Sequence, residues 1–335
     1  MTGIIVMRAA AKENAGHSAG HDTEQHTGKT LVLGAAGFIG TNLCNALTRQ
    51  GADLILFDRF FAEDKTAMWA GKAQLLTGSF DGQTDFDQLT EGVETVYHLI
   101  STTCPTNSNL DIAAEYTDNV LPTVRLLDAC VRSGVKRVVF LSSGGTVYGK
   151  DHTGVCREED DAFPISSYGV QKLTIEKLLY LYEYLHGLDY RIVRLSNPYG
   201  PHQRPDGVQG VVTTFLYRTL KGEPIRLYGD GSVVRDYIYI DDAVRGILAI
   251  AADGAPRRLY NLGSGQGTSV AQLIELLPEV TGIAPVVEHL PARAADVPVN
   301  ILDVARFHAD YDIGAFLPLK EGMRRTVEFF RNAGI

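Results

Sequence analysis

The sequence lacks several features that define whole classes of protein. It has only four cysteines in 335 residues, Cys44, Cys104, Cys130 and Cys156, and no two of them form a CxxC pair. This spacing excludes a dense disulfide framework, argues against a metal site and is typical of reduced thiols in a cytoplasmic protein. No apolar run approaches the roughly 18–20 residues that span a bilayer, so no membrane partner is expected.

Positive charge is also scarce. The chain has 31 Lys and Arg against 40 Asp and Glu, a net charge of −9, which makes nucleic acid an unlikely class of partner. The overall composition, with 45% apolar and 21% charged residues, is typical of a globular protein, and the length allows one large or two smaller domains. Residues 1–28 are polar and aperiodic, so we expect an unstructured extension or a mis-assigned start, with His17, His21 and His26 solvated.

From Lys29 onward, short apolar strands alternate with amphipathic helices. DLILFD, ETVYHLIS and KRVVFLSS are predicted strands, and helices are expected over 111–133 and from about 167 to 185. This alternation predicts an α/β fold with a Rossmann-type doubly wound parallel sheet. After Asn197 the pattern loosens into Pro/Gly-rich loops and short helices. We therefore expect a sheet domain of 29–196 and 236–265, and a smaller, discontinuous C-terminal lobe of 197–235 and 266–335.

A glycine-rich turn lies where the first strand meets the first helix. Gly34, Gly37 and Gly40 have Gly-x-x-Gly-x-x-Gly spacing, which lets the backbone approach a pyrophosphate at a helix N-terminus. Asp58 follows 58 − 34 = 24 residues later, at the end of the second strand. A carboxylate there accepts hydrogen bonds from the adenosine ribose and repels a 2′-phosphate, which favours NAD. Arg59 keeps NADP as the alternative, and Asp58 as a plain turn residue is another.

Tyr168 and Lys172 are four residues apart at the start of the second long helix and so share a face. An ammonium beside a phenol stabilises the phenolate and lowers its pKa, so the phenolate can accept a proton from a sugar hydroxyl. A Tyr-x-x-x-Lys pair alone is common on helix surfaces. Behind a dinucleotide turn, it predicts a catalytic pair.

Together these motifs make the chain similar to the extended short-chain dehydrogenase/reductase family, in particular NAD-dependent epimerases and dehydratases of the UDP-glucose 4-epimerase type. The resemblance covers 29–335 and rests on LGAAGFIG, DNV at 118–120, SSGGTVYG, SYGVQK, RLSNPYGP at 194–201, VVRDYIYIDD at 233–242 and NLGSG. It implies an NAD-binding sheet domain, a nucleotide-sugar-binding lobe and NAD as cofactor. The implied activity is 4-epimerisation of a nucleotide sugar, most simply a UDP-sugar, through a transient 4-keto sugar, in a homodimer formed by the helices at 111–133 and 167–185.

The resemblance also implies roles for individual residues. Tyr168 would be the catalytic base and Lys172 its partner. NAD would be bound by Gly34, Gly37, Phe38, Ile39, Gly40, Asp58, Arg59, Ser79, Phe80, Leu99, Ile100, Ser101, Asn119, Tyr168, Lys172 and Leu195. The substrate would be bound by Thr103, Asn197, Val212, Tyr228, Arg235, Arg293, Asp296 and Asn300, with the two arginines on the diphosphate. The chain departs from the family at Ser79 (usually Asp), Thr103 (often Lys) and Pro122 (usually Gly), which alters the expected cofactor contacts.

The strand end FLSSGGTVYG lacks a hydroxyl where the family carries its catalytic Ser or Thr, because that position is Gly144. Two glycines could let the backbone turn so that Ser143 or Thr146 reaches inward, and a water could also fill the gap. Alternate strand residues point to opposite faces, so Ser143 should point away from the side of Gly144. Thr146 is therefore the favoured replacement hydroxyl, and Ser143 is the second candidate.

Gly145 and Thr146 stand where 4,6-dehydratases of this family carry Asp-Glu, the acid/base pair that water elimination needs. The sequence therefore favours an epimerase over a dehydratase, and Asp58 disfavours an NADPH-dependent reductase. A non-catalytic dinucleotide sensor is a further alternative, which the intact Tyr168 and Lys172 oppose. Asn300 is either a plain loop residue after Pro298 or the substrate gate. The resemblance implies a gate, because a tyrosine there excludes N-acetylhexosamines in the resembled epimerases, whereas an amide could bind an acetamido group or a carboxylate.

Overall fold

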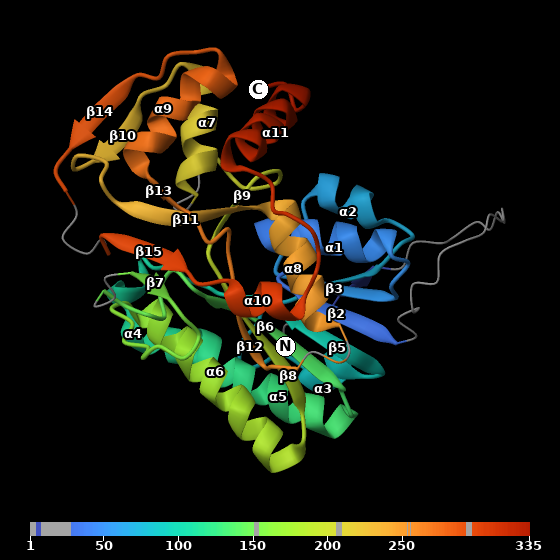
Figure 1. Ribbon diagram of the computed structural model, residues 1–335. Helices are drawn as coiled ribbons and strands as arrows, with labels where there is room; N and C mark the ends of the chain where they lie inside the picture. Colours follow the sequence, from blue (N-terminus) through green and yellow to red (C-terminus); the bar gives the residue numbers. More distant parts are fainter. Residues whose placement is uncertain are drawn as a thin grey trace. The chain divides into compact units, whose positions relative to one another are not determined.

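The structure is a computed structural model that describes residues 5–7, 28–150, 154–205, 210–252, 254, 256–292 and 297–335. The chain divides into two compact units, whose helices and strands are labelled in Figure 1. The first unit comprises Met1–Thr102, Ala113–Phe140 and Lys177–Tyr190, and the second comprises Thr103–Ile112, Leu141–Glu176 and Arg191–Ile335. These units are not the domains expected from the sequence, whose boundaries remain a prediction.

The first unit is built on a parallel sheet. Its strands β4 (Gln74–Thr77), β3 (Leu54–Asp58), β2 (Lys29–Leu33), β5 (Val93–His98) and the start of β6 (Arg137–Ser143) are hydrogen-bonded in that order. Leu33 lies opposite both Phe57 and His98 in the central register. β2 and β3 are almost entirely buried, which explains why they read as continuous apolar runs rather than as alternating ones.

A short antiparallel strand, β1 (Ile5–Met7), pairs with β4. It lies inside the segment 1–28 that the sequence predicts to be an unstructured extension. The predicted solvated histidines His17, His21 and His26 lie outside the described residues.

The helices of the first unit follow its strands. They are α1 (Phe38–Arg49), α2 (Glu63–Trp69), α3 (Phe86–Thr90) and α5 (Leu121–Ser133). The helix predicted over 111–133 is not regular, because a π-helical turn, η2 (Tyr116–Val120), separates α4 (Ile112–Glu115) from α5. Gly134 ends α5 with φ 70°, the left-handed conformation expected of a C-terminal glycine.

The second unit contains α6 as far as Glu176, most of β8 and a second sheet. α6 (Ser167–His186) carries the predicted catalytic pair, and β8 (Asp189–Leu195) pairs in parallel with β12 (Leu259–Leu262). The second sheet has the order β13 (Gly267–Ser269), β11 (Val234–Tyr239), β15 (Val299–Leu302) and β7 (Val155–Cys156), with β9 (Asn197–Tyr199) also paired to β11. The sequence predicts that residues 236–265 return to the sheet of the NAD-binding domain. In that segment β12 pairs with β8 of this sheet, whereas β11 belongs to the second sheet. Strand propensity predicts that a segment is extended, but not which strand it pairs with.

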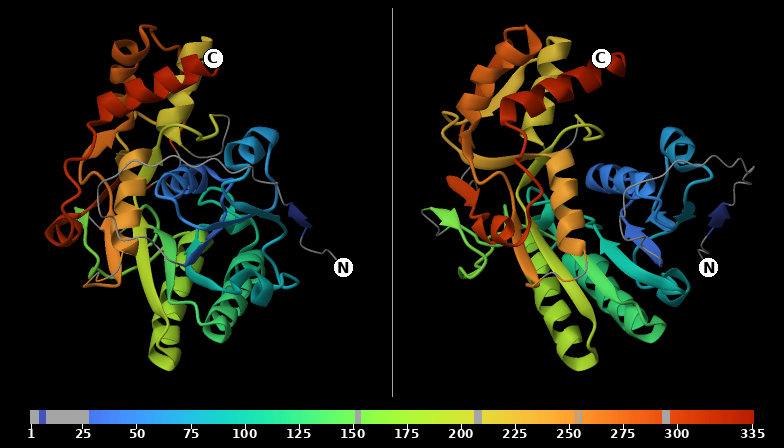
Figure 2. Two further views of the ribbon diagram at one scale, coloured as in Figure 1. Left: turned by 90° about the vertical axis from the view of Figure 1, so that its right-hand side faces the viewer. Right: turned by 45° about the vertical axis from the view of Figure 1, so that its right-hand side comes forward.

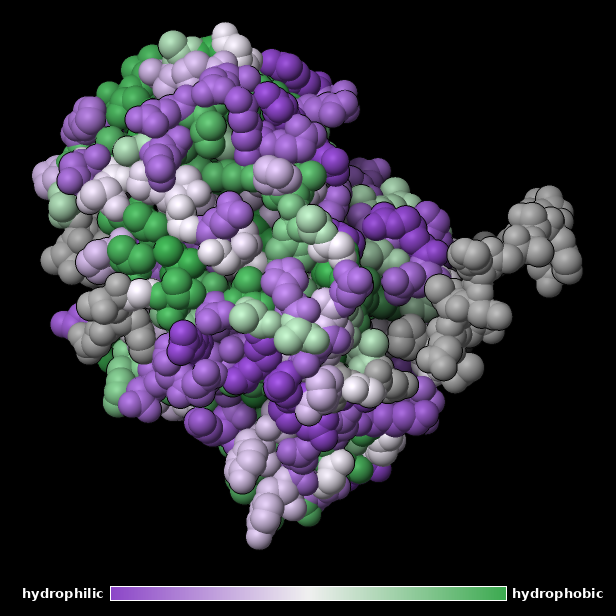
Figure 3. All heavy atoms as spheres, in the orientation of Figure 1, coloured by the Kyte–Doolittle hydropathy of each residue, from purple (hydrophilic) through white to green (hydrophobic). Residues whose placement is uncertain are grey.

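Three helices of this unit pack against one another near a two-stranded sheet. α7 (Val211–Lys221), α9 (Val270–Thr281) and α11 (Leu319–Asn332) contact one another, and β10 (Ile225–Tyr228) pairs with β14 (Val287–Leu290) in parallel (Figures 1 and 2). α8 (Ile240–Ala251) contacts β9, β11 and β12, α10 (Ala305–Asp310) contacts β12, and the 3₁₀ turn η1 (Ser108–Leu110) lies against the start of α6. Hydrophilic residues are spread over the face shown in Figure 3, with smaller hydrophobic areas between them.

Candidate functional site

The glycine-rich turn connects β2 to α1 in the first unit. Gly34 has φ +86°, and its amide donates to the carbonyl of Phe57 at 2.9 Å. A Cβ on Gly40 would lie 2.0 Å from the Gly34 carbonyl oxygen, so only glycine lets α1 approach the turn this closely. Gly37 is the N-cap of α1 and provides no side-chain cap, and the first helical turn has no acidic residue. An uncapped helix N-terminus beside open backbone fits the pyrophosphate of a dinucleotide.

Asp58 ends β3 directly beside this turn. One of its carboxylate oxygens accepts the amide of Ala36 at 2.9 Å, and the other accepts the amide of Arg59 at 2.7 Å. Burial raises the pKa of Asp58, and these backbone amides oppose that rise. The carboxylate therefore holds the glycine-rich turn and keeps lone pairs for further donors. Its contact with Ala36 is not visible in the sequence, where Asp58 stands out as a ribose ligand or as a plain turn residue.

Asn119 lies in the π-helical turn and fixes the segment after β5. Its Oδ1 accepts the amide of Thr102 at 3.0 Å, and its Nδ2 donates to the Thr102 hydroxyl at 2.8 Å. The Thr123 hydroxyl donates to the Asn119 carbonyl at 2.6 Å. Asn119 is thus bound to the stretch that follows Ser101, and its predicted NAD contact stays a prediction. π-turns are frequent where a helix must place one side chain at a functional site.

The other residues predicted to bind the cofactor lie around these elements. A Cβ on Gly34 would lie 3.3 Å from the Ile100 amide nitrogen, so the segment just after β5 borders the turn. Phe80 is buried against Phe86 and His98, which makes it a core residue of the first unit. Phe38 and Ile39 begin α1 and are half-buried, as are Leu99 and Ser101, whereas Arg59 and Ser79 are exposed and Leu195 is buried in the second unit.

In the second unit, α6 brings Tyr168 and Lys172 together. The Lys172 ammonium lies 5.6 Å from the centroid of the Tyr168 ring and donates to the Leu141 carbonyl at 2.9 Å. Lys172 is only 3% exposed, so its charge acts in a poorly solvated environment. The start of α6 is fixed because Ser167 donates through its hydroxyl to the Ser108 carbonyl at 2.6 Å and through its amide to Asn109 at 2.7 Å. The spacing of the motif predicts this arrangement, in which Tyr168 is half-buried beside the lysine, and the acid/base role of Tyr168 stays a prediction.

Gly144 is constrained by packing. A Cβ there would lie 2.5 Å from Leu302 Cδ1 and 3.1 Å from the Arg194 carbonyl oxygen. Leu302 belongs to a buried cluster with Val147, Tyr148 and Cys156. A side chain at position 144 would therefore point into this cluster, and the glycine is required by close approach rather than by backbone conformation.

Ser143 and Thr146 occupy different surroundings. An added Cβ on Gly145 would lie 3.9 Å from both Ser143 Oγ and Asn197 Oδ1, so these two polar groups lie on one side of Gly145. The Thr146 hydroxyl is buried without a hydrogen-bond partner among the described residues. A Cβ on Gly169 would lie 2.9 Å from the Thr146 carbonyl oxygen, so Thr146 lies against the start of α6, next to Tyr168. An unpaired buried hydroxyl is costly unless a ligand atom completes it.

The predicted substrate residues lie on β9, β11, β15, α7 and β10, and Thr103 lies in the loop before η1. Asn197 Nδ2 donates to the Asp236 carbonyl at 3.0 Å, and Arg235 donates to the carbonyls of Val234 and Val297 at 2.8 and 2.6 Å. Asn300 lies opposite Arg235, is only 2% exposed and donates through Nδ2 to the Gly144 carbonyl at 3.1 Å. Val212 is buried on α7, Thr103 and Tyr228 are half-buried, and Arg293 and Asp296 lie outside the described residues.

Asp236 is a residue that the sequence reasoning missed. Its buried carboxylate accepts the Ser264 amide at 2.8 Å, the Ser264 hydroxyl at 2.7 Å and the Gly265 amide at 3.1 Å. Burial raises the pKa of Asp236, and these donors oppose the rise. Since its carbonyl also holds Asn197, Asp236 fixes the residues around the predicted diphosphate contacts. An acidic residue amid the apolar residues of a predicted strand was the available signal.

Two further findings concern the described residues only. They contain no cluster of three or more His, Cys, Asp or Glu side chains able to hold a metal ion. None of their helices combines the length and apolar character needed to cross a membrane.

A dinucleotide-type glycine turn and a Tyr-Lys pair together define a nucleotide-dependent enzyme of the short-chain dehydrogenase type. The model of the NAD-dependent epimerase/dehydratase family matches residues 30–263. The chain belongs to this family. A UDP-glucose 4-epimerase of Mycolicibacterium smegmatis is 32% identical over 314 residues, which cover 91% of this chain and 99% of that protein.

Solved structures give the same result. The crystal structure of a UDP-glucose 4-epimerase from Thermotoga maritima with UDP-glucose has a TM-score of 0.85 and 34% identity, covering 92% of this chain and all of that one. A Thermus thermophilus UDP-glucose 4-epimerase in complex with NAD has a TM-score of 0.82 and 30% identity, covering 91% and 99%. The predicted family, Rossmann-type fold class, NAD cofactor and enzyme class, a nucleotide-sugar epimerase, are confirmed.

Proposed function

We propose that this enzyme interconverts the C4 epimers of a UDP-linked sugar, with Tyr168 as the acid/base group. The observation that carries the proposal is the Tyr168–Lys172 pair, in which a buried ammonium lies 5.6 Å from the phenol ring. The relatives named above support a UDP-sugar as substrate. Hexose, N-acetylhexosamine and uronate are the candidate sugars.

The chain's own residues account for the proton chemistry. NAD would be held at the glycine-rich turn and Asp58, and would supply reversible hydride transfer at C4 of the sugar. Tyr168 would take the 4-hydroxyl proton as the 4-keto sugar forms. It would return the proton after the 4-keto sugar has rotated to present its other face. Lys172 stabilises the phenolate, because it is held near the ring by the Leu141 carbonyl. Asn197 and Arg235, together with Arg293, would bind the diphosphate, while Tyr228 and Asp296 would contact the nucleoside.

The dehydratase alternative lacks the groups it needs. Gly145 has no side chain, and the Thr146 hydroxyl is not an acid/base group near neutral pH, so no carboxylate pair is present for water elimination. A reductase would need exchangeable NADPH, which the carboxylate of Asp58 disfavours. A non-catalytic sensor would have no use for a buried lysine beside an α6 tyrosine.

Product analysis tests the activity directly. The purified chain is incubated separately with UDP-glucose, UDP-N-acetylglucosamine and UDP-glucuronate, and the C4 epimers are quantified by anion-exchange chromatography and NMR. We expect net conversion of at least one substrate without net production of NADH. A 4-keto-6-deoxy product would establish a dehydratase instead, and no conversion of any of the three would contradict the proposal.

Asp58→Ala should weaken NAD binding and relax the discrimination against NADP. The substitution removes both the ribose acceptor and the hydrogen bond that holds Ala36. Binding of each dinucleotide is measured by isothermal titration calorimetry. Asp53→Ala, an exposed aspartate just before the other end of β3, is the matched control and should bind both like the wild type. Tight NADP binding by the wild type would contradict this role of Asp58.

Thr146→Val should lower kcat more than Ser143→Ala, because the buried Thr146 hydroxyl lacks a partner and lies beside the start of α6. The melting temperature of the Thr146→Val protein should not fall, since the removed hydroxyl makes no hydrogen bond with a described residue. Steady-state kinetics and thermal unfolding measure the two effects. A larger loss of kcat in Ser143→Ala would assign the missing hydroxyl to Ser143, on the side of Gly145 that Asn197 shares.

A homodimer is supported by the exposed face of α6. Tyr180, Leu181, Tyr184 and Leu185 are apolar or aromatic and exposed, with Tyr184 at 79%. The Tyr182 hydroxyl donates to Asp128 at 2.6 Å, which shows that α6 lies beside α5 in the first unit. Two copies could bury these side chains in a helical interface.

A cytoplasmic location is also part of the proposal, in keeping with four cysteines that form no disulfide.

A further inference from the structure

A buried ion pair between Glu176 and Arg194 lies in the second unit, one helical turn along α6 from Lys172 of the proposed catalytic pair. Arg194 donates through Nε to Glu176 Oε1 at 3.0 Å and through a terminal nitrogen to Glu176 Oε2 at 2.7 Å. The Ser142 hydroxyl donates to the same carboxylate at 2.5 Å. Both charged side chains are less than 5% exposed, at 4% for arginine and 3% for glutamate.

This ion pair connects the three elements that carry the proposed chemistry. Glu176 lies one helical turn after Lys172 on α6, and Ser142 lies beside Ser143 at the end of β6. Arg194 lies near the end of β8, three residues before Asn197. The Lys172 ammonium binds Leu141, the neighbour of Ser142, so α6 is tied to β6 at two successive turns.

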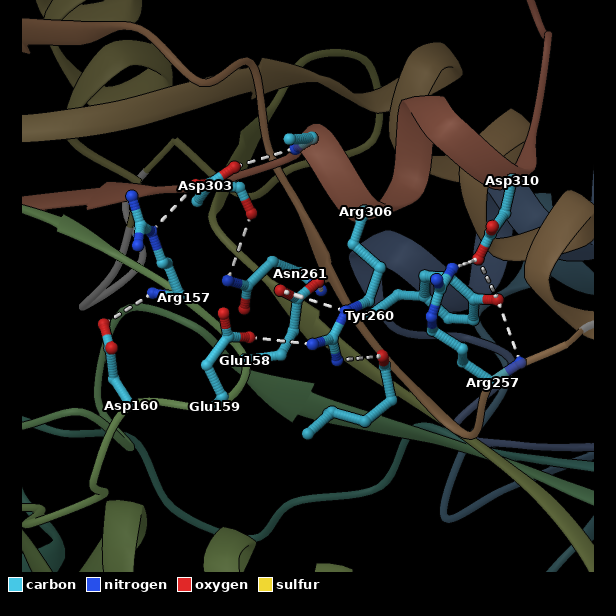
Figure 4. Close-up of polar contacts among 12 residues, drawn as sticks. Arg157, Glu158, Glu159, Asp160, Arg257, Tyr260, Asn261, Asp303, Arg306 and Asp310 are labelled. Atoms are coloured by element: carbon cyan, nitrogen blue, oxygen red, sulfur yellow. Dashed lines mark hydrogen bonds and ion pairs between the residues drawn. The ribbon is translucent and has the colours of Figure 1, made fainter.

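The arginine is itself held from the other side. Its guanidinium lies 4.8 Å from the centroid of the Tyr148 ring, and the Tyr148 hydroxyl donates to Asn261 Oδ1 at 2.6 Å. Asn261 belongs to the polar network of Figure 4, where its Nδ2 donates to the Asp303 carbonyl at 3.2 Å and its amide donates to Glu158 at 2.9 Å. The guanidinium therefore contacts the Glu176 carboxylate on one side and the Tyr148 ring on the other.

Stability alone does not explain such a pair. Removing two charges from water costs about as much as their attraction returns, and apolar residues of similar volume often stabilise a protein as well or better. We propose that Glu176 and Arg194 are positioning residues, which fix the register of α6 against the ends of β6 and β8 and so hold Lys172 and Tyr168 in their reactive geometry. This inference rests on the proposed function of Tyr168 and Lys172.

The test separates activity from stability. In the double variant Glu176→Leu/Arg194→Met the charges are replaced together by apolar side chains, and the melting temperature should stay at or above that of the wild type. The kcat should fall by about 10²-fold, the usual effect of a misplacement of about 1 Å at a reacting group, whereas KM should change little. If the pair were merely structural, kcat would be retained along with the melting temperature, and that result would overturn the proposal. An unfolded double variant would overturn it as well.

The matched control uses the same two strands at their other ends. Arg137 and Asp189 begin β6 and β8 and form an ion pair at 2.7 Å. Arg137→Met/Asp189→Leu removes an Arg–carboxylate pair, at 14% and 22% exposure, between the opposite ends of the same strands, with Arg137 four residues before Leu141 (141 − 137 = 4). Its kcat should equal that of the wild type. A loss of kcat as large as that of the first double variant would show a general effect of charge removal and contradict positioning.

A second readout does not depend on turnover. Reductive methylation of Lys172, followed by mass spectrometry with the exposed Lys177 as reference, should be slow in the wild type and faster in Glu176→Leu/Arg194→Met. Ser142→Ala, which leaves the ion pair in place, should change kcat and methylation in the same direction by smaller factors. Unchanged methylation in both variants would refute the proposal. Failure of the proposed function is a different result, namely no epimerisation by the wild-type enzyme.

Discussion

Tyr168→Phe is expected to lower kcat by about 10²–10⁴-fold, the usual contribution of a positioned acid/base group. The substitution removes only the phenolic oxygen and keeps the ring beside Lys172, so the packing at the start of α6 is preserved. Substrate and NAD should bind with nearly unchanged affinity, because neither the glycine-rich turn nor the residues proposed to bind the diphosphate are altered. The loss should therefore appear in kcat and in kcat/KM alike.

A control on the same helix distinguishes chemistry from packing. Tyr180→Phe changes an exposed tyrosine three turns along α6 and should leave kcat unchanged. Steady-state kinetics, thermal unfolding and calorimetric titration with UDP are measured on both variants. Near wild-type turnover in Tyr168→Phe would exclude Tyr168 as the base. A large drop in the melting temperature would assign it a structural role instead.

Gly144→Ser should destabilise the protein by about 1–3 kcal/mol, the usual cost of overpacking, and should not raise kcat. The family resemblance alone suggests the opposite, since serine would supply the hydroxyl that this resemblance leads one to expect at position 144. In this chain the added Cβ would lie 2.5 Å from Leu302 Cδ1 and 3.1 Å from the Arg194 carbonyl oxygen. The backbone oxygen has little freedom to move away. Urea unfolding measures the loss.

Two further variants identify the cause. Gly145→Ser is the matched control, because a Cβ there would meet nothing closer than 3.9 Å, and its stability should stay close to that of the wild type. Leu302→Ala should be destabilising by itself, yet the double variant Gly144→Ser/Leu302→Ala should lose less than the sum of the two single losses. Strict additivity would show that Leu302 is not the obstacle. Increased turnover in Gly144→Ser would contradict the packing argument.

Spacing along the chain carries much of the fold and part of the site. The glycines at 34, 37 and 40, Asp58 at the next strand end, and the four-residue step from Tyr168 to Lys172 are local patterns, and local geometry places them as expected. What the sequence does not reveal are contacts between distant segments. Asn300 reads as a substrate gate but donates to Gly144, which is 156 residues away, and Asp236 reads as a strand residue but binds a turn 28 residues further on.

The same limit explains Asn119 and Gly144. Nothing in the DNV stretch indicates that an asparagine would be bound at both its polar atoms by Thr102, because that partner is chosen by folding. The residue that opposes a side chain at position 144 comes from β15, more than 150 residues later. Residue type and spacing predict which groups are available for chemistry, whereas packing decides which of them are free to use.

The π-helical turn Tyr116–Val120 has a consequence for how this helix can change. Such a turn closes its hydrogen bond over five residues where an α-helix uses four, so it holds one extra residue. Deleting a single residue there would restore a regular helix of the kind that apolar periodicity predicts for 111–133. Because the π-turn takes up the extra residue locally, the change would fall mainly within the turn itself, where Asn119 would lose its placement against Thr102. A shorter chain would gain helical regularity and lose the anchor of the segment after β5, so we expect this length of helix to tolerate substitution far better than deletion.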